Sequence, residues 1–172
     1  TEATRGCHHT CAHCPVVPVY RGRFFAIPRQ VVLADIRQQV ATGVRHITFG
    51  DPDFLNGPTH SLRICRALHE EFPDVTFDFT TRIEHIVRHR DLMPEFRRLG
   101  CVFVVSAVEL LSERALKAIR KGHSRADVLE ALRVCDNAGI ALRPSLLPFT
   151  PWTTLEDYLE LLEFIEEEEL IE

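Results

Sequence analysis

The sequence has no apolar run long enough to cross a bilayer, no signal peptide and no stripe of basic residues. Its net charge is -5 with histidines counted as neutral, and its lysines and arginines are scattered along the chain. These absences argue against a membrane protein and give no signal for a nucleic-acid partner. At 172 residues, 45% of them hydrophobic, the chain is long enough for one core and too short for two. We therefore expect one domain over residues 1–172, in the cytoplasm.

An initiator methionine is also missing. The chain begins at Thr1, inside an expected strand over Thr1–Arg5, and stops within the acidic run Glu166–Glu169. We therefore expect the domain to be truncated at both ends.

The cysteines do not have the spacing of a disulfide framework. Cys65, Cys101 and Cys135 stand singly in apolar segments, and we interpret them as reduced, buried side chains. The other three, Cys7, Cys11 and Cys14, form one C-x3-C-x2-C loop. This pattern favours a reducing compartment and a metal-type loop.

Three thiolates on one loop suit a four-iron cluster that leaves one iron open to another ligand. A structural zinc site needs four ligands, so a zinc-binding module would have to add His8 or His9 to the cysteines. An iron–sulfur protein for electron transfer or redox sensing would also need a fourth ligand, which the three single cysteines are poorly placed to supply. Both alternatives stay open at this point.

The rest of the chain alternates strands and helices. After the strand stub at 1–5, apolar or β-branched strands are predicted at 44–49, 75–81, 101–107 and 140–147. Amphipathic helices are predicted at 28–42, 60–72, 84–99 with a break before Pro94, 112–120, 124–138 and from Thr154 onward. Residues 15–28 are predicted to form a long loop. Such alternation predicts parallel strands in an open sheet or a barrel, with ligands at the carboxyl ends of the strands.

The cysteine spacing, with the His13 ring just before Cys14, resembles the signature loop of the radical S-adenosylmethionine (SAM) superfamily. The resemblance implies a [4Fe-4S] cluster on Cys7, Cys11 and Cys14, and SAM bound to the open iron and cleaved reductively to start radical chemistry. It implies an α/β fold, a partial (β/α)6 TIM-like barrel of which about five βα units are present. An external electron donor such as flavodoxin or ferredoxin is implied as a partner.

The resemblance also assigns SAM-binding roles at the strand ends. Gly50-Asp51 resembles the aspartate-bearing form of the motif that receives the SAM amino group. Glu109, and less strongly Ser106, would hold the ribose hydroxyls, and Arg143 would reach the SAM carboxylate.

Each of these assignments has a structural alternative. The Asp51 carboxylate could cap the following loop, and Arg143 could form a surface ion pair. Glu109 could cap the next helix or pair with Lys117 or Lys121. Arg82, after the third of the strands, could hold an anion or be solvated.

The order of these motifs is closest to cobalamin-dependent methyltransferases and methylthiotransferases. It also suggests a subgroup with a cysteine- or selenocysteine-containing tail, found near genes for unusual, in places arsenic-containing, natural products; that tail would lie beyond Glu172. The expected substrate is an unidentified small molecule, and transfer of the 3-amino-3-carboxypropyl group of SAM is one outcome that the family includes.

Overall fold

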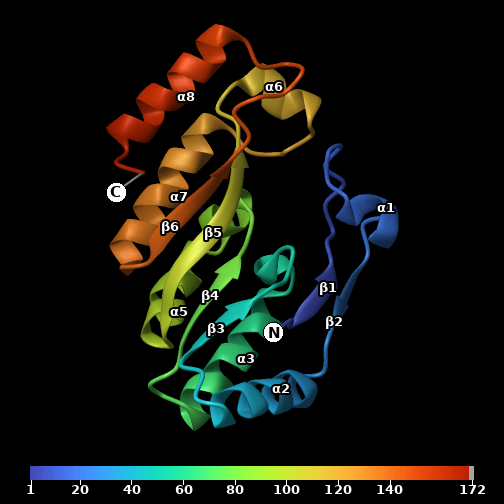
Figure 1. The fold of residues 1–172 in the computed structure, drawn as a ribbon, viewed down its shortest axis with the longest axis vertical. Helices are drawn as coiled ribbons and strands as arrows, with labels where there is room; N and C mark the ends of the chain where they lie inside the picture. Colours follow the sequence, from blue (N-terminus) through green and yellow to red (C-terminus); the bar gives the residue numbers. More distant parts are fainter. Residues whose placement is uncertain (171–172) are drawn as a thin grey trace.

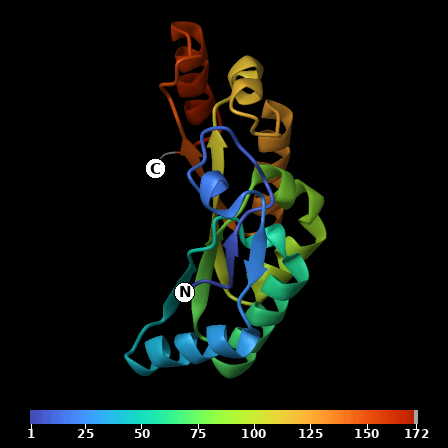
Figure 2. The ribbon, with the colours of Figure 1, turned by 90° about the vertical axis from the view of Figure 1, so that its right-hand side faces the viewer.

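A four-stranded parallel sheet forms the centre of the computed structural model, which describes residues 1–170. Its strands lie in the order β3-β4-β5-β6, and α3, α4, α5 and α7 lie along one side of it, while α6 lies beyond the end of β5 (Figures 1 and 2). A separate two-stranded antiparallel sheet, β1-β2, stands beside it at the start of the chain. The elements in chain order are β1 (Thr4–Gly6), α1 (Val16–Tyr20), β2 (Phe24–Ala26), α2 (Arg29–Ala41), β3 (His46–Phe49), η1 (Phe54–Asn56), α3 (Pro58–Glu71), β4 (Thr76–Thr80), α4 (Ile83–Arg88), η2 (Arg90–Leu92), α5 (Met93–Arg98), β5 (Cys101–Glu109), α6 (Glu113–Ala118), α7 (Arg125–Ala138), β6 (Ala141–Leu146) and α8 (Leu155–Glu167).

Strand alternation separates an apolar face from a polar face of this sheet. Phe49, Phe77 and Phe79 are fully buried and join Phe54 and Phe96 in an aromatic cluster, with ring centroids 4.6 to 6.5 Å apart. On the opposite face, Asp78 accepts hydrogen bonds from neighbouring polar side chains of β3. Burial of the aromatic face against helices is what fixes the register of the strands.

The predicted parallel α/β architecture is confirmed for β3 to β6, with every strand pair parallel. The predicted interruption before Pro94 is also confirmed, because α4 and α5 are separate helices joined by a short 3-10 turn. β5 runs to Glu109, two residues further than predicted, so that this carboxylate belongs to the strand itself.

The prediction for the start of the chain was wrong in two respects. Residues 15–28 are not a long loop, because they contain α1 and β2. The first strand does not simply join the parallel sheet, because β1 pairs antiparallel with β2. Thr1 lies beside β3 and bonds to its backbone. The Thr1 amino group donates to the Thr48 carbonyl at 3.0 Å, and the Thr1 carbonyl accepts from the Gly50 N–H at 2.8 Å.

Glycine is required where β1 ends. Gly6 has φ +83°, and a side-chain carbon there would lie 2.3 Å from the Arg23 carbonyl oxygen. The cysteine loop follows directly and lies over the carboxyl ends of β4 and β5. Among residues 1–170, no helix has the length and apolarity needed to cross a membrane.

Candidate SAM and iron–sulfur site

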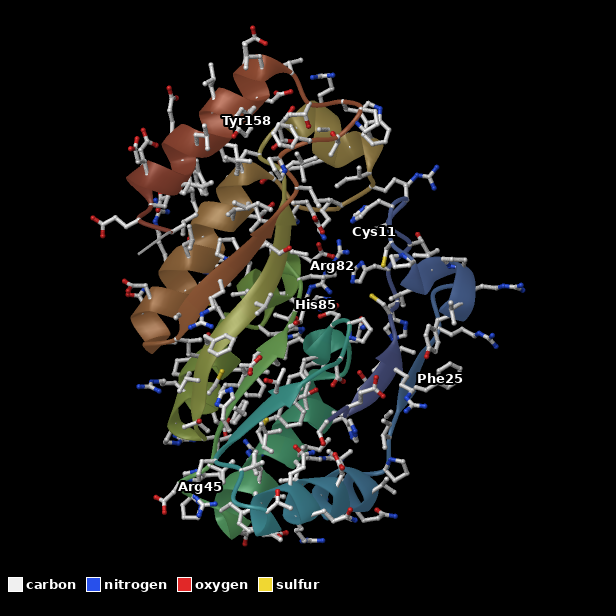
Figure 3. The ribbon with its side chains drawn as sticks, viewed as in Figure 1. Cys11, Phe25, Arg45, Arg82, His85 and Tyr158 are labelled. Atoms are coloured by element: carbon white, nitrogen blue, oxygen red, sulfur yellow. The ribbon has the colours of Figure 1, made fainter. Side chains whose placement is uncertain are left out.

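A cavity of about 130 Å³ lies where the cysteine loop covers the ends of the strands. Figure 3 shows Cys11 on that loop, with Arg82 and His85 reaching toward it from the sheet side. The residues that line the cavity are Cys7, His9, Cys11, His13, Cys14, Pro52, Thr80, Thr81, Arg82, Ala107, Glu109 and Lys121. A larger hollow of about 660 Å³ runs along α7 and β6, but no cysteine lines it, so we place the chemistry in the smaller cavity.

The cysteine loop is held by backbone hydrogen bonds. The Cys14 N–H donates to the Cys11 carbonyl at 3.2 Å, and the Ala12 N–H donates to the Ile119 carbonyl at 3.0 Å. Cys11 is buried, while Cys7 and Cys14 are half-buried, and all three are free thiols. Burial raises the pKa of the Cys7 thiol. Three sulfur donors thus share one side of the cavity.

Arg82, from the turn after β4, binds the central cysteine. Its Nη1 lies 2.8 Å from the Cys11 Sγ, and its Nη2 donates to Glu84 at 2.8 Å and to the Lys121 carbonyl. Burial alone would lower the pKa of Arg82, but the hydrogen bond to Glu84 and the Cys11 charge hold it above its usual value. A permanently charged guanidinium therefore lies within hydrogen-bond distance of the Cys11 sulfur.

Glu109 forms the opposite wall with a buried ion pair. Its Oε1 lies 2.9 Å from the Lys121 Nζ and 3.4 Å from the His13 Nε2. Glu109 has φ +66°, in the left-handed region that a side chain with a Cβ seldom adopts. Backbone strain of this kind clusters at functional sites. Glu109 and His13 both line the cavity, and Glu109 forms the pair with Lys121 that the sequence left open as its structural alternative.

Four predicted SAM contacts do not line this cavity. Asp51 accepts a hydrogen bond from the Ala3 N–H at 2.9 Å and another from the Thr4 hydroxyl, and burial raises its pKa. Gly50 holds Thr1, as described above. The Ser106 hydroxyl donates to the Thr81 carbonyl at 2.7 Å, and the Arg143 guanidinium stacks on the Phe103 ring at 3.9 Å.

Sequence reasoning missed a second polar cluster beside the cysteine loop. His9 and His85 face each other with 3.4 Å between their Nε2 atoms. His85 also contacts Asp53, and His9 contacts Glu84. Burial lowers the pKa of His9, and the Arg82 charge lowers it further. Asp53 and His85 both follow strand ends, so the rule that ligands gather there could have found them.

The donor set fits a four-iron cluster with an open iron. Three thiols face one cavity, whereas Cys65, Cys101 and Cys135 are fully buried in the core. Burial raises the pKa of Cys135 to about 12, as expected for a thiol that packs as a small apolar group. These three cysteines are therefore reduced and buried, as predicted, and the cluster can take only three thiolates from the described residues.

Comparison with known proteins agrees with a four-iron cluster on this loop. A family model described as the radical SAM superfamily matches residues 1–165. The ribosomal protein uS12 methylthiotransferase RimO of Chloroherpeton thalassium is 25% identical over 96% of this chain and 40% of its own length. A tRNA-2-methylthio-N(6)-dimethylallyladenosine synthase of Desulfosudis oleivorans is 31% identical over 94% of this chain and 36% of its own.

Solved structures share the fold. The cobalamin-dependent SAM radical enzyme OxsB, with aqua-cobalamin and SAM bound, has a TM-score of 0.82 at 23% identity and covers 96% of this chain and 26% of its own. The methyltransferase TsrM from Kitasatospora setae, with cobalamin and a [4Fe-4S] cluster bound, has a TM-score of 0.77 at 18% identity, over 97% of this chain and 32% of its own. The chain spans two fifths or less of these proteins. With the cysteine loop at the carboxyl ends of a parallel sheet and a match over nearly all residues, the chain belongs to the radical SAM superfamily, whose cofactors are a [4Fe-4S] cluster and SAM.

Proposed function

We propose that this chain holds the cluster on Cys7, Cys11 and Cys14 and binds SAM in the adjoining cavity, to start radical chemistry on a small molecule. When bound and reduced, the cluster supplies the electron that breaks a C–S bond of SAM. The observation that carries the proposal is the cavity itself, because three thiols and a buried Glu109–Lys121 pair line the same space.

The chain's own residues would bind the two ends of SAM differently. Glu109 is a hydrogen-bond acceptor suited to the ribose hydroxyls, and His13 lies against it. Lys121 and Arg82 are the cations of the cavity wall, and they suit the SAM carboxylate. These charges also compensate the thiolates, so that the buried site carries groups of both signs.

Gly50, Asp51, Ser106 and Arg143 remain predicted SAM contacts. The hydrogen bonds of Gly50, Asp51 and Ser106 to the backbone favour a supporting role, in which they hold the strand ends that shape the cavity. Arg143 stacks on Phe103 and does not line the cavity. An anionic part of a ligand that extends from the cavity across β5 could reach it.

The remaining parts of the proposal concern partners and context. A small-molecule substrate is supported by the scattered basic residues and the net charge of -5, although the named relatives are enzymes of a ribosomal protein and of tRNA. An external flavodoxin or ferredoxin would supply the electron. Residues 1–172 would form one radical SAM core. Its place would be the cytoplasm, a reducing compartment that suits six cysteines forming no disulfide in the described structure.

Anaerobic reconstitution with iron and sulfide, followed by EPR of the reduced protein with and without SAM, tests the proposal. We expect a four-iron signal that SAM changes. Product analysis then identifies the broken bond: 5′-deoxyadenosine reports the adenosyl radical, and 5′-methylthioadenosine reports release of the 3-amino-3-carboxypropyl group. A signal that SAM leaves unchanged would favour an electron-transfer protein, and tight zinc without a cluster would favour a structural module.

A further inference from the structure

Two imidazoles from distant parts of the chain face each other beside the cysteine loop. His9 lies between Cys7 and Cys11, and His85 lies in α4, below the loop in Figure 3. Their Nε2 atoms are 3.4 Å apart. A carboxylate stands behind each ring: Asp53 oxygens lie 3.0 and 3.1 Å from the His85 Nδ1, and the Glu84 Oε1 lies 3.3 Å from the His9 Nδ1.

These carboxylates determine where the imidazole protons lie. A neutral imidazole has one N–H and one lone pair, and a carboxylate beside one nitrogen favours the proton on that nitrogen. With the protons on the two outer Nδ1 atoms, both inner Nε2 atoms present lone pairs to each other. Two lone pairs at 3.4 Å repel unless a cation lies between them.

We propose that a single divalent transition-metal ion, of the zinc or iron(II) type, binds between His9 and His85, at a site separate from the cluster. Metal–imidazole bonds to zinc are about 2.0–2.1 Å long, so two nitrogens of a tetrahedral site lie about 3.3–3.4 Å apart. The observed separation of 3.4 Å matches this spacing. The outer carboxylates occupy the position from which they orient metal-bound histidines and raise their basicity.

Burial and charge are consistent with a cation at this point. His85 and Asp53 are 5% and 0% exposed, and the Asp53 Oδ1 accepts a hydrogen bond from the Thr81 hydroxyl at 2.6 Å. The Asp53 Oδ2 lies 3.0 Å from the His85 Nδ1, and among the described residues it has no hydrogen bond of good geometry. Ligand atoms of His9, His85 and Asp53 lie within 4.8 Å of one another, so this carboxylate can also move onto the metal as a third ligand. Two histidines and one carboxylate with open positions suit iron(II) as well as zinc.

Zinc binding to the cluster-loaded full chain tests the site. The reconstituted protein is equilibrated anaerobically with Zn²⁺ alone and desalted, and its zinc and iron are counted by mass spectrometry. We expect one zinc per chain in addition to four irons. His85→Ala and His85→Gln should both lose the zinc and keep the irons, and Asp53→Asn should weaken zinc affinity about 10- to 100-fold.

His46→Ala is the matched control. His46 also contacts a carboxylate, with 2.8 Å between its Nε2 and the Asp78 Oδ2, but we find no second imidazole facing it among the described residues. This variant should keep the zinc.

Three results would overturn the proposal. The wild-type chain could bind no zinc beyond the cluster, in which case a shared proton joins the two rings. Zinc could remain bound in both His85 variants. Zinc could enter only as iron is lost, with sulfur ligands in its X-ray absorption spectrum, and would then belong to the cysteine loop. Each result is read from metal content, independently of whether the enzyme turns over SAM.

Discussion

Arg82 joins the cysteine loop to two other parts of the site. It contacts Cys11, Glu84 and the Lys121 backbone, and its Nε finds no partner among the described residues. Gly122 leaves room for it, because a side-chain carbon there would lie 3.2 Å from the Arg82 Nη2. Hydrogen bonds to cluster sulfurs and nearby charge set the reduction potential of iron–sulfur clusters. We therefore expect Arg82 to act on the cluster through Cys11, its proposed ligand.

Replacing Arg82 with Gln should make the cluster harder to reduce. The variant loses a positive charge and an N–H···S bond that both stabilise the more electron-rich state. We expect the midpoint potential to fall by on the order of 60 mV, equivalent to a tenfold change in a one-electron equilibrium. The measurement is a redox titration followed by EPR, without SAM.

Arg66→Gln is the control for that titration. Arg66 forms an exposed ion pair with Glu95, with 2.8 Å between Nε and Oε1, and does not line the cavity. Equal potentials for the Arg82 variant and the wild type, at equal iron content, would contradict the assignment.

Glu109→Gln should weaken SAM binding about 10- to 100-fold while the cluster content stays unchanged. The variant removes the charged acceptor, and hydrogen bonds to charged groups contribute about 1.5–3 kcal/mol. Equilibrium binding of SAM to the reconstituted protein is the measurement. Glu113→Gln, at the start of α6 outside the cavity, is the control. SAM affinity equal to that of the wild type would remove Glu109 from the binding site.

Residue types at strand ends indicated the site but not the direction of each side chain. Cys7, Cys11, Cys14, His13 and Glu109 all line the cavity. Gly50 and Asp51 follow β3, Ser106 lies within β5 and Arg143 lies within β6. None of these four lines the cavity, because the alternation of faces and the position of the N-terminal segment decide where a side chain goes. His9 and His85 are 76 positions apart in the sequence, so no local sequence pattern predicts that their rings face each other.

At the scale of elements, helix starts were predictable and short strands were not. Ser124 and Thr154 stand where the sequence places helix starts, and each forms a capping box there, with Asp127 and Asp157 as the reciprocal partners. β1 and β2 have three residues each, too few for a detectable period. Their pairing depends on the turn that follows α1, where Arg21 and Gly22 both have positive φ.

Ser124→Ala should lower the free energy of unfolding by about 1 kcal/mol, the usual cost of losing an N-cap side chain. The Ser124 hydroxyl accepts from the Asp127 N–H at 3.2 Å, and no other hydroxyl replaces it at this helix end. Thermal unfolding of the reconstituted protein gives the change. Ser124→Thr keeps the acceptor and should recover most of the loss, so equal destabilisation by both variants would argue against the cap.

At the scale of the molecule, the alternation of strands and helices predicted parallel strands, while pattern alone could not separate an open sheet from a partial barrel. The difference between an open sheet and a partial barrel depends on how the sheet curves around its polar face. On that face His46 and Thr48 both bind Asp78, which is 3% exposed. A buried carboxylate shared by two strands holds β3 and β4 in register from the side opposite the aromatic cluster.

The stability of the whole fold should fall in mild acid because of His123. This histidine is 7% exposed, and its Nε2 lies 3.1 Å from the Val108 carbonyl oxygen. Burial lowers the pKa of His123 to about 4, and the Lys121 charge adds to the effect. The unfolded chain, with a histidine pKa near 6.5, then binds the proton more strongly than the folded one. The stabilising contribution is present above pH ~6.5 and is lost as the pH falls toward ~4.

Between about pH 7 and 5 this difference in pKa corresponds to a loss of about 2 kcal/mol. We expect the unfolding temperature of the wild-type protein to fall over that range, and that of His123→Gln to fall much less, since the variant has no imidazole to protonate. Cluster loss in acid would lower both proteins equally, so the comparison isolates His123. Parallel pH profiles for the two proteins would show that acid acts on another group, and the buried Asp53, whose pKa is lowered by its hydrogen bond to His85 despite burial, would then be the next to replace.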